Sequence, residues 1–113
     1  MGNESFRQEN EKYKITKVGV LNSKINESSG LEIGSTDTTF YTMNDGTYNE
    51  IYEINQTGDL LQTHQIQGSI NQDWEELAKD NKGNLYIGDV GNNNNHRKDL
   101  KIYITNFLQP KDS

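Results

Sequence analysis

The sequence of 113 residues contains no cysteine, two histidines, one proline and one tryptophan. The absence of cysteine excludes a disulfide scaffold and zinc sites built on thiolates, and it leaves the redox compartment open. His64 and His96 have no acid or thiol at ligand spacing, so neither a zinc site nor a histidine-based catalytic pair is supported. Ser28 and Ser29 lack the strand-to-helix turn of a hydrolase nucleophile. No self-contained active site is recognisable, and whether the chain is an enzyme stays open.

Positive charge is scarce, because 11 lysines and arginines stand against 17 acidic residues and give a net charge of −6. Such a chain is a poor partner for nucleic acid or an anionic membrane, and a better one for cations or basic proteins. No apolar run approaches the roughly 18 residues of a membrane span. The opening residues MGNESFRQENEK contain no signal-peptide core, although a processed precursor could also begin this way. We expect no membrane span and no signal peptide in this chain.

Apolar residues make up 30% of the chain and recur in short alternating segments rather than with a helical period. Alternation at period two is typical of strands that bury one face. Residues 73–79 are long enough for one helical turn, but turn-forming residues flank them. The sequence predicts strands at 13–21, 31–33, 39–43, 50–54, 60–66, 77–79, 85–88 and 100–104.

The two halves of the chain align with each other, and the first two matches are 46 and 45 residues apart. A repeat of this length with four short strands is typical of propeller blades. We therefore predict an all-β fold of antiparallel four-stranded blades, forming a partial β-propeller. The matches are Ser29 with Glu75, Phe40 with Leu85, and 51–54 with 101–104. The predicted organisation is a flexible N-terminal tail at 1–12, about two blades within 13–105 (repeats near 27–68 and 71–105), and a C-terminal tail at 106–113.

Two sequence blocks are the most specific in combination, DWEE at 73–76 and YIGDVGNN at 86–93. They accompany ESSGL at 27–31, FYTMNDG at 40–46 and IYEI at 51–54. With these motifs the chain resembles a family of bacterial extracytoplasmic β-propeller proteins, related in shape to the NHL, SMP-30 and phytase-like propellers. The resemblance implies a ring of about six blades, of which this chain would supply about two, and a periplasmic or secreted location.

Loops between blades and the starts of inner strands face the central channel of a propeller, where ligands and metals usually lie. Oxygen ligands suit Ca²⁺ or Mg²⁺ better than zinc. The likeness to SMP-30-like propellers also implies a divalent ion with carboxylate and Asn ligands. The alternative is that these side chains cap turns through hydrogen bonds to the backbone. The predicted ligands, with Ca²⁺ as the expected ion, are Asp45, Glu75, Asp89, Glu27, Asn44 and Asn92.

Other conspicuous side chains have structural interpretations. Trp74 either lines a sugar or base site or anchors the core, and core packing is favoured. Arg97 either pairs with Asp89 or Glu75, or is a solvated surface charge. Packing between blades is the interpretation for Tyr41, Tyr52, Tyr86 and Tyr103.

The leading hypothesis is a non-catalytic binding or scaffold segment of a β-propeller with a divalent cation in its acidic loops. The alternative is a part of a metal-dependent hydrolase, phytase-like or lactonase-like, in which the ion polarises a phosphate or ester oxygen. A third possibility is a small self-contained β domain. Because two blades alone leave faces uncovered, we expect the remaining blades or further copies of this chain as partners, besides a small-molecule or protein ligand whose identity the sequence does not give.

Overall fold

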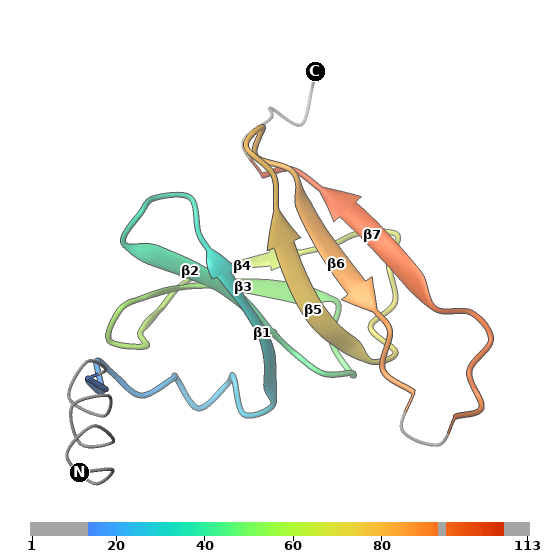
Figure 1. Cartoon of the computed structure of the whole chain (residues 1–113), viewed down its shortest axis with the longest axis horizontal. Coiled ribbons are helices and arrows are strands. Elements are labelled where there is room, and N and C mark those ends of the chain that lie inside the picture. The colour runs from blue at the N-terminus through green and yellow to red at the C-terminus, as the bar shows by residue number, and fades with distance from the viewer. Residues whose placement is uncertain (1–13, 93–94, 108–113) are drawn as a thin grey trace, which may run out of the picture.

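The computed structural model describes residues 14–92 and 95–107. Within these ranges the regular structure consists of β-strands, and no helix is long and apolar enough to cross a membrane. The strands form two antiparallel sheets, one of four strands and one of three (Figure 1), which confirms the all-β prediction. The strands are β1 (Ser28–Ile33), β2 (Thr39–Asn44), β3 (Glu50–Asn55), β4 (Leu60–Gln65), β5 (Trp74–Lys79), β6 (Leu85–Asp89) and β7 (Lys101–Thr105).

The first sheet has the strand order β1-β2-β3-β4, so each strand pairs with its neighbour in sequence. The turn between β3 and β4 is formed by its own polar residues. The Asn55 side chain accepts hydrogen bonds from the backbone N–H groups of Thr57 and Asp59, at 3.1 and 2.9 Å. Between them, Gly58 has a φ of 93°, a left-handed conformation that favours glycine. The predicted turn at this position is confirmed.

The second sheet has the order β5-β6-β7 and repeats the first three strands of the first sheet. Its tightest turn is held by Asp80, whose carboxylate accepts hydrogen bonds from the N–H groups of Lys82 and Asn84. β5 and β6 begin 46 residues after β1 and β2, and β7 begins 51 residues after β3 because the loop before it is longer. Within the described ranges, no fourth strand follows β7.

A shared apolar core joins the two sheets. Trp74, at the start of β5, is completely buried, and its indole N–H donates a hydrogen bond to the Ile70 carbonyl at 3.1 Å. Truncating a buried aromatic residue costs about 3–5 kcal/mol, so Trp74 contributes strongly to sheet packing. Its prediction as a core anchor is confirmed. The core comprises Tyr41, Met43, Ile51, Ile66, Trp74, Leu77, Leu85 and Ile87, with Tyr103 and Phe107 packed against it.

The opposite face of the first sheet is covered by the chain that precedes β1. Ile25 in this segment is 4% exposed and packs against Tyr52 and Ile54, together with Phe40 and Leu60. Exposed apolar residues lie on the corresponding outer face of the second sheet, where Ile102 and Ile104 of β7 are 69% and 63% exposed.

Residues 14–21 do not form the predicted strand. They have no regular structure, and Ile15 and Val18 are 97% and 62% exposed. Alternation of residue types indicates a strand only where another strand supplies hydrogen-bond partners, and a lone strand leaves its backbone groups unpaired. The prediction is therefore wrong for these residues. Residue 13 and the predicted tail 1–12 lie outside the described ranges.

Two boundaries also differ from the prediction. The strand expected at 77–79 begins earlier, at Trp74, so residues 74–79 form a strand and the alternative of a helical turn is wrong. Within the tail expected at 106–113, Phe107 packs against the core. Both corrections have one cause, because contacts with the other sheet extend β5 and hold Phe107 in place.

Candidate metal centre

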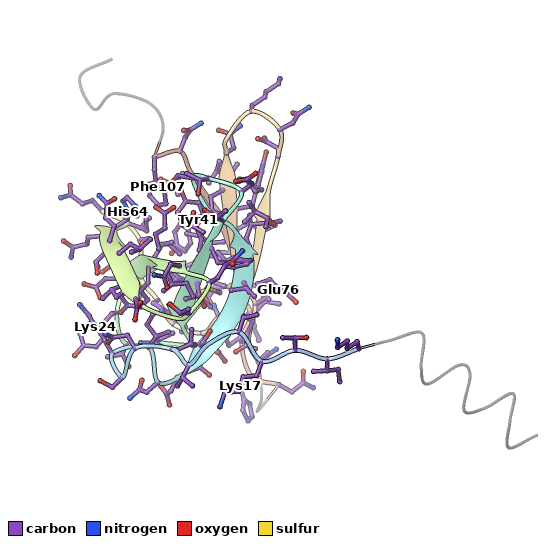
Figure 2. The ribbon with its side chains drawn as sticks, turned by 90° about the vertical axis from the view of Figure 1, so that its left-hand side faces the viewer. Lys17, Lys24, Tyr41, His64, Glu76 and Phe107 are labelled. Atoms are coloured by element: carbon purple, nitrogen blue, oxygen red, sulfur yellow. The ribbon has the colours of Figure 1, made fainter. Side chains whose placement is uncertain are left out.

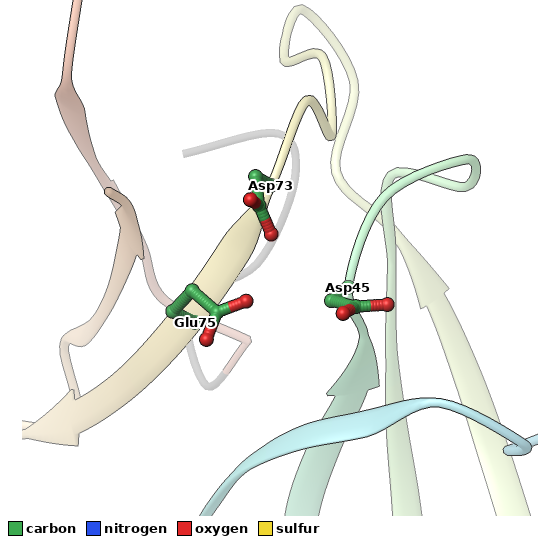
Figure 3. A group of neighbouring side chains, drawn as sticks. All are labelled: Asp45, Asp73 and Glu75. Atoms are coloured by element: carbon green, nitrogen blue, oxygen red, sulfur yellow. The ribbon is translucent and has the colours of Figure 1, made fainter. Parts of the chain in front are cut away.

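Three carboxylates gather where the two sheets meet. Asp45 follows β2, Asp73 precedes β5, and Glu75 lies in β5. One carboxylate oxygen of each lies within 4.8 Å of the others, and none of the three residues is buried. Figure 3 shows the acids beside one another, Asp45 coming from the first sheet and the other two from the second. The cluster is therefore shared between the sheets.

The buried side chain of Asn71 fixes the distance between the two halves of this cluster. Its carbonyl oxygen accepts hydrogen bonds from the N–H groups of Gly46 and Trp74, at 2.8 and 3.1 Å. Its amide donates to the carbonyls of Asn44 and Tyr48, at 2.8 and 2.7 Å. One side chain thus ties the turn after β2 to the start of β5. Asp45 and the acids of the second sheet are held together by this link.

Local geometry places Asp73 and Glu75 on the same side. They are two residues apart, on either side of the buried Trp74, and the register of β5 against β6 shifts at Glu75, between Trp74 and Glu76. Gly91 lies against Asp73, since its N–H donates to the Asp73 carbonyl at 3.1 Å. A Cβ atom at residue 91 would collide with the Asp73 carboxylate. Glycine at this position therefore leaves room for the acid.

The acids influence one another's ionisation. The pKa of Glu75 is raised, chiefly by a hydrogen bond with the Asp73 carboxyl, then by partial burial and by repulsion from Asp73, Asp45 and Glu76. Like charges at this separation disfavour the fully ionised state. A bound cation would relieve the repulsion and lower the pKa of Glu75.

Asp89, a predicted ligand, lies beside the cluster but has other partners. It is 1% exposed, and its carboxylate accepts hydrogen bonds from the N–H groups of Gln72 and Asp73. Arg97 donates to it at 2.7 Å and also donates to the Gly91 carbonyl. The predicted pairing of Arg97 with Asp89 is confirmed. Asp89 is therefore buried in an ion pair with Arg97, and from there it orients the backbone of Asp73.

The remaining predicted ligands lie in backbone contacts. The side-chain oxygen of Asn44 accepts a hydrogen bond from the Glu27 N–H, and its amide donates to the Lys24 carbonyl. Asn92 accepts a hydrogen bond from the Arg97 N–H. These amides cap loops, as in the alternative interpretation. The Glu27 side chain is exposed, and Glu27 is not part of the acidic cluster.

The structure brings Asp45 and Glu75 together as the sequence analysis expected, and it adds Asp73. The signal for Asp73 was its spacing of two residues from Glu75. Asn71 was missed as well, and its role has no local sequence signal because its partners Gly46 and Asn44 lie more than twenty positions away.

Comparison with family models, curated proteins and solved structures gave no match. The chemistry is therefore argued from the cluster itself. Carboxylate oxygens are the ligands that Ca²⁺ and Mg²⁺ prefer, and Ca²⁺ takes about 6–8 of them. Asp45, Asp73 and Glu75 would supply part of that number, and water would supply the rest.

A separate groove of about 750 Å³ lies between β4 and the end of β7. His64 lines it, with its ring stacked on Phe107 at 3.9 Å between centroids and edge-on to Tyr41 at 6.3 Å. Figure 2 shows these three aromatic side chains at one end of the molecule. The His64 Nε2 atom is buried without a hydrogen-bond partner. Burial lowers the pKa of His64, and the nearby Glu53 partly opposes this.

Proposed function

We propose that this chain is a non-catalytic binding or scaffold segment of a β-propeller that holds a divalent cation, Ca²⁺ in the first instance, at the junction of its two sheets. The observation that carries the proposal is the approach of Asp45 from one sheet to Asp73 and Glu75 from the other, within 4.8 Å. Ligands from both sheets mean that the ion would link them. Since an ion of this kind binds the folded state, it would also stabilise the fold.

The environment of the cluster supports a modest affinity. Each of the three acids is at least partly exposed, so water reaches all of them. Extracellular calcium modules bind with dissociation constants of about 10⁻⁴–10⁻³ M. An affinity in that range would agree with the extracytoplasmic location that the family resemblance implies.

Calorimetric titration of the metal-free protein with Ca²⁺, combined with thermal unfolding, tests the proposal. We expect heat on binding and a rise in melting temperature. Glu75→Gln should abolish both effects, whereas Asp37→Asn, which removes one charge from an exposed loop residue outside the cluster, should retain them. The absence of heat and of a melting shift up to about 10 mM Ca²⁺, beyond the weakest natural sites, would end the proposal.

Two further variants sharpen the test. Gly91→Ala leaves every charge in place but pushes against the Asp73 carboxylate, so it should weaken binding without altering electrostatics. Glu75→Gln should change stability in opposite directions with and without the ion. In metal-free protein it removes repulsion and raises the melting temperature, because the raised pKa shows that the charged form of Glu75 is disfavoured. In saturating Ca²⁺ it removes a ligand and lowers the melting temperature.

One observation favours the hydrolase as a second candidate. Asp73 and Glu75 share a hydrogen bond that raises the pKa of Glu75, and paired carboxyls serve as acid and base in many enzymes. Beside a cation they could activate water on a phosphate ester or lactone. Ca²⁺-dependent turnover of such substrates that is lost in Asp73→Asn would favour this candidate over the scaffold.

A further inference from the structure

Asp45 is followed by Gly46, and this is the only place in the sequence where an aspartate or asparagine precedes a glycine. Every other aspartate precedes a residue whose side chain hinders access to the next backbone nitrogen. Glycine has no Cβ, so its nitrogen reaches the neighbouring carboxyl group most easily. The pair therefore contains both partners of an intramolecular reaction, a carboxyl carbon and a backbone nitrogen that can attack it.

The reaction that such a pair undergoes is isomerisation through a cyclic imide. The Gly46 nitrogen forms a bond with the side-chain carboxyl carbon of Asp45, and the N–H proton, one solvent proton and a carboxylate oxygen leave together as water. A water molecule then opens the ring at either carbonyl carbon. Opening at one carbonyl restores aspartate, whereas opening at the other gives isoaspartate, in which the main chain runs through the former side chain. Water and protons are the only other reactants.

The folded protein leaves the carboxyl group accessible but occupies the nitrogen. Asp45 follows β2 at the junction of the sheets, and its side chain is at least partly exposed (Figure 3). The Gly46 N–H donates a hydrogen bond to the side-chain oxygen of Asn71 at 2.8 Å. Because Asn71 is 7% exposed, little water is present to replace this contact. The nitrogen must give up the hydrogen bond before it can attack.

The backbone that follows Gly46 is strained. Thr47 has a φ of 80°, which a β-branched residue rarely adopts, and across it the Tyr48 N–H donates to the Gly46 carbonyl at 3.1 Å. Asn71 holds this turn from both sides, because its amide donates to the carbonyls of Asn44 and Tyr48. Strain of this kind persists only where the surrounding contacts enforce it. Loss of the Asn71 contacts would therefore relax the turn and release the Gly46 nitrogen.

We propose that Asp45 is a site of spontaneous isomerisation and that Asn71 suppresses the reaction while the two sheets are packed. Isoaspartate at residue 45 would then mark molecules in which the turn after β2 has opened. Because isomerisation lengthens the main chain by one carbon, a modified molecule would not restore the same contacts. The inference does not depend on the cation, so its tests are run in the presence of a chelator.

Ageing of the purified protein, followed by peptide mapping, measures the reaction. Isoaspartate is detected by enzymatic methylation of its carboxyl group and by a shift in peptide retention at unchanged mass. We expect it in the peptide that contains residue 45, at a rate at least about tenfold higher in the urea-denatured chain than in the folded protein. Asp45→Glu keeps the carboxylate but would need a larger ring, so the signal should disappear. Isoaspartate at other positions only, or equal rates in the folded and denatured protein, would overturn the proposal.

A matched comparison separates the role of Asn71 from a general loss of stability. We expect Asn71→Ala to isomerise at least about tenfold faster than the wild type. The control is the wild-type protein in the urea concentration that lowers its free energy of unfolding to that of the variant, and at this equal stability Asn71→Ala should still react faster. Equal rates at matched stability would refute the suppression by Asn71.

Thr47→Gly gives a second test that keeps Asn71 in place. Glycine adopts a φ of 80° without strain, so the turn should open less often and isomerisation should be about threefold slower than in the wild type. The same ageing and peptide mapping measure this rate. A Thr47→Gly protein that reacts as fast as the wild type would show that opening of the turn does not control the reaction, and the proposal would fail.

Discussion

Replacing Asn71 should destabilise the protein strongly, because its side chain links the two sheets. Asn71 is 7% exposed and makes four hydrogen bonds to backbone groups. Asn71→Ala leaves the N–H groups of Gly46 and Trp74 and the carbonyls of Asn44 and Tyr48 without this partner. Each hydrogen bond contributes about 0.5–1.5 kcal/mol net. Because water reaches part of the site, we expect a loss of about 2–4 kcal/mol in the free energy of unfolding.

Urea denaturation followed by Trp74 fluorescence measures this loss from the shift in midpoint at constant slope. Asn71→Asp is the informative partner variant, since it keeps the two acceptor contacts but sets a carboxylate against two carbonyls and adds charge beside the acids. It should be at least as destabilising as Asn71→Ala. The exposed neighbour Gln72 provides the control, and Gln72→Ala should cost less than about 0.5 kcal/mol. A cost for Asn71→Ala no larger than this control would refute the role of Asn71 as the link between the sheets.

Two further predictions concern pH and backbone conformation. The pKa of His64 is lowered from its ordinary value of 6.5 by burial, so the unfolded chain binds a proton that the folded chain does not, and stability falls as pH drops below about 6.5 towards the folded pKa. His64→Gln should flatten this part of the stability profile between pH 5 and 7.5, and an unchanged slope would contradict the assignment. This window lies above the titration of Glu53, where burial opposes ionisation but hydrogen bonds from Ser35 and Thr39 lower the pKa from 4.5. Gly58→Ala should cost more than about 1 kcal/mol, because Gly58 has a φ of 93° and an added Cβ would strike the Val20 carbonyl. Chemical denaturation checks this cost, and a neutral substitution would show that the chain before β1 is not held against the β3–β4 turn.

Local patterns were enough to predict most of the strands. Alternating apolar residues and turn signals such as Asn55 to Asp59 located β2, β3, β4, β6 and β7 within a few residues. These signals depend on residues close in sequence, which share one hairpin. Residues 14–21 carry the same pattern and failed as a strand, because the pattern does not report whether a partner edge is within reach.

The candidate site was only partly predictable for the same reason. Asp45 and Glu75 were identified as acids at strand ends, and the structure brings them together with Asp73. The pattern could not separate these acids from Asp89, because burial beside Arg97 is a property of the packed sheets. The role of Asn71 depends wholly on tertiary contacts.

The acidic cluster exists only while the two sheets are packed on each other, because Asp45 belongs to the first sheet and Asp73 and Glu75 to the second. A core substitution far from the cluster that loosens this packing would therefore also move the three carboxylates apart.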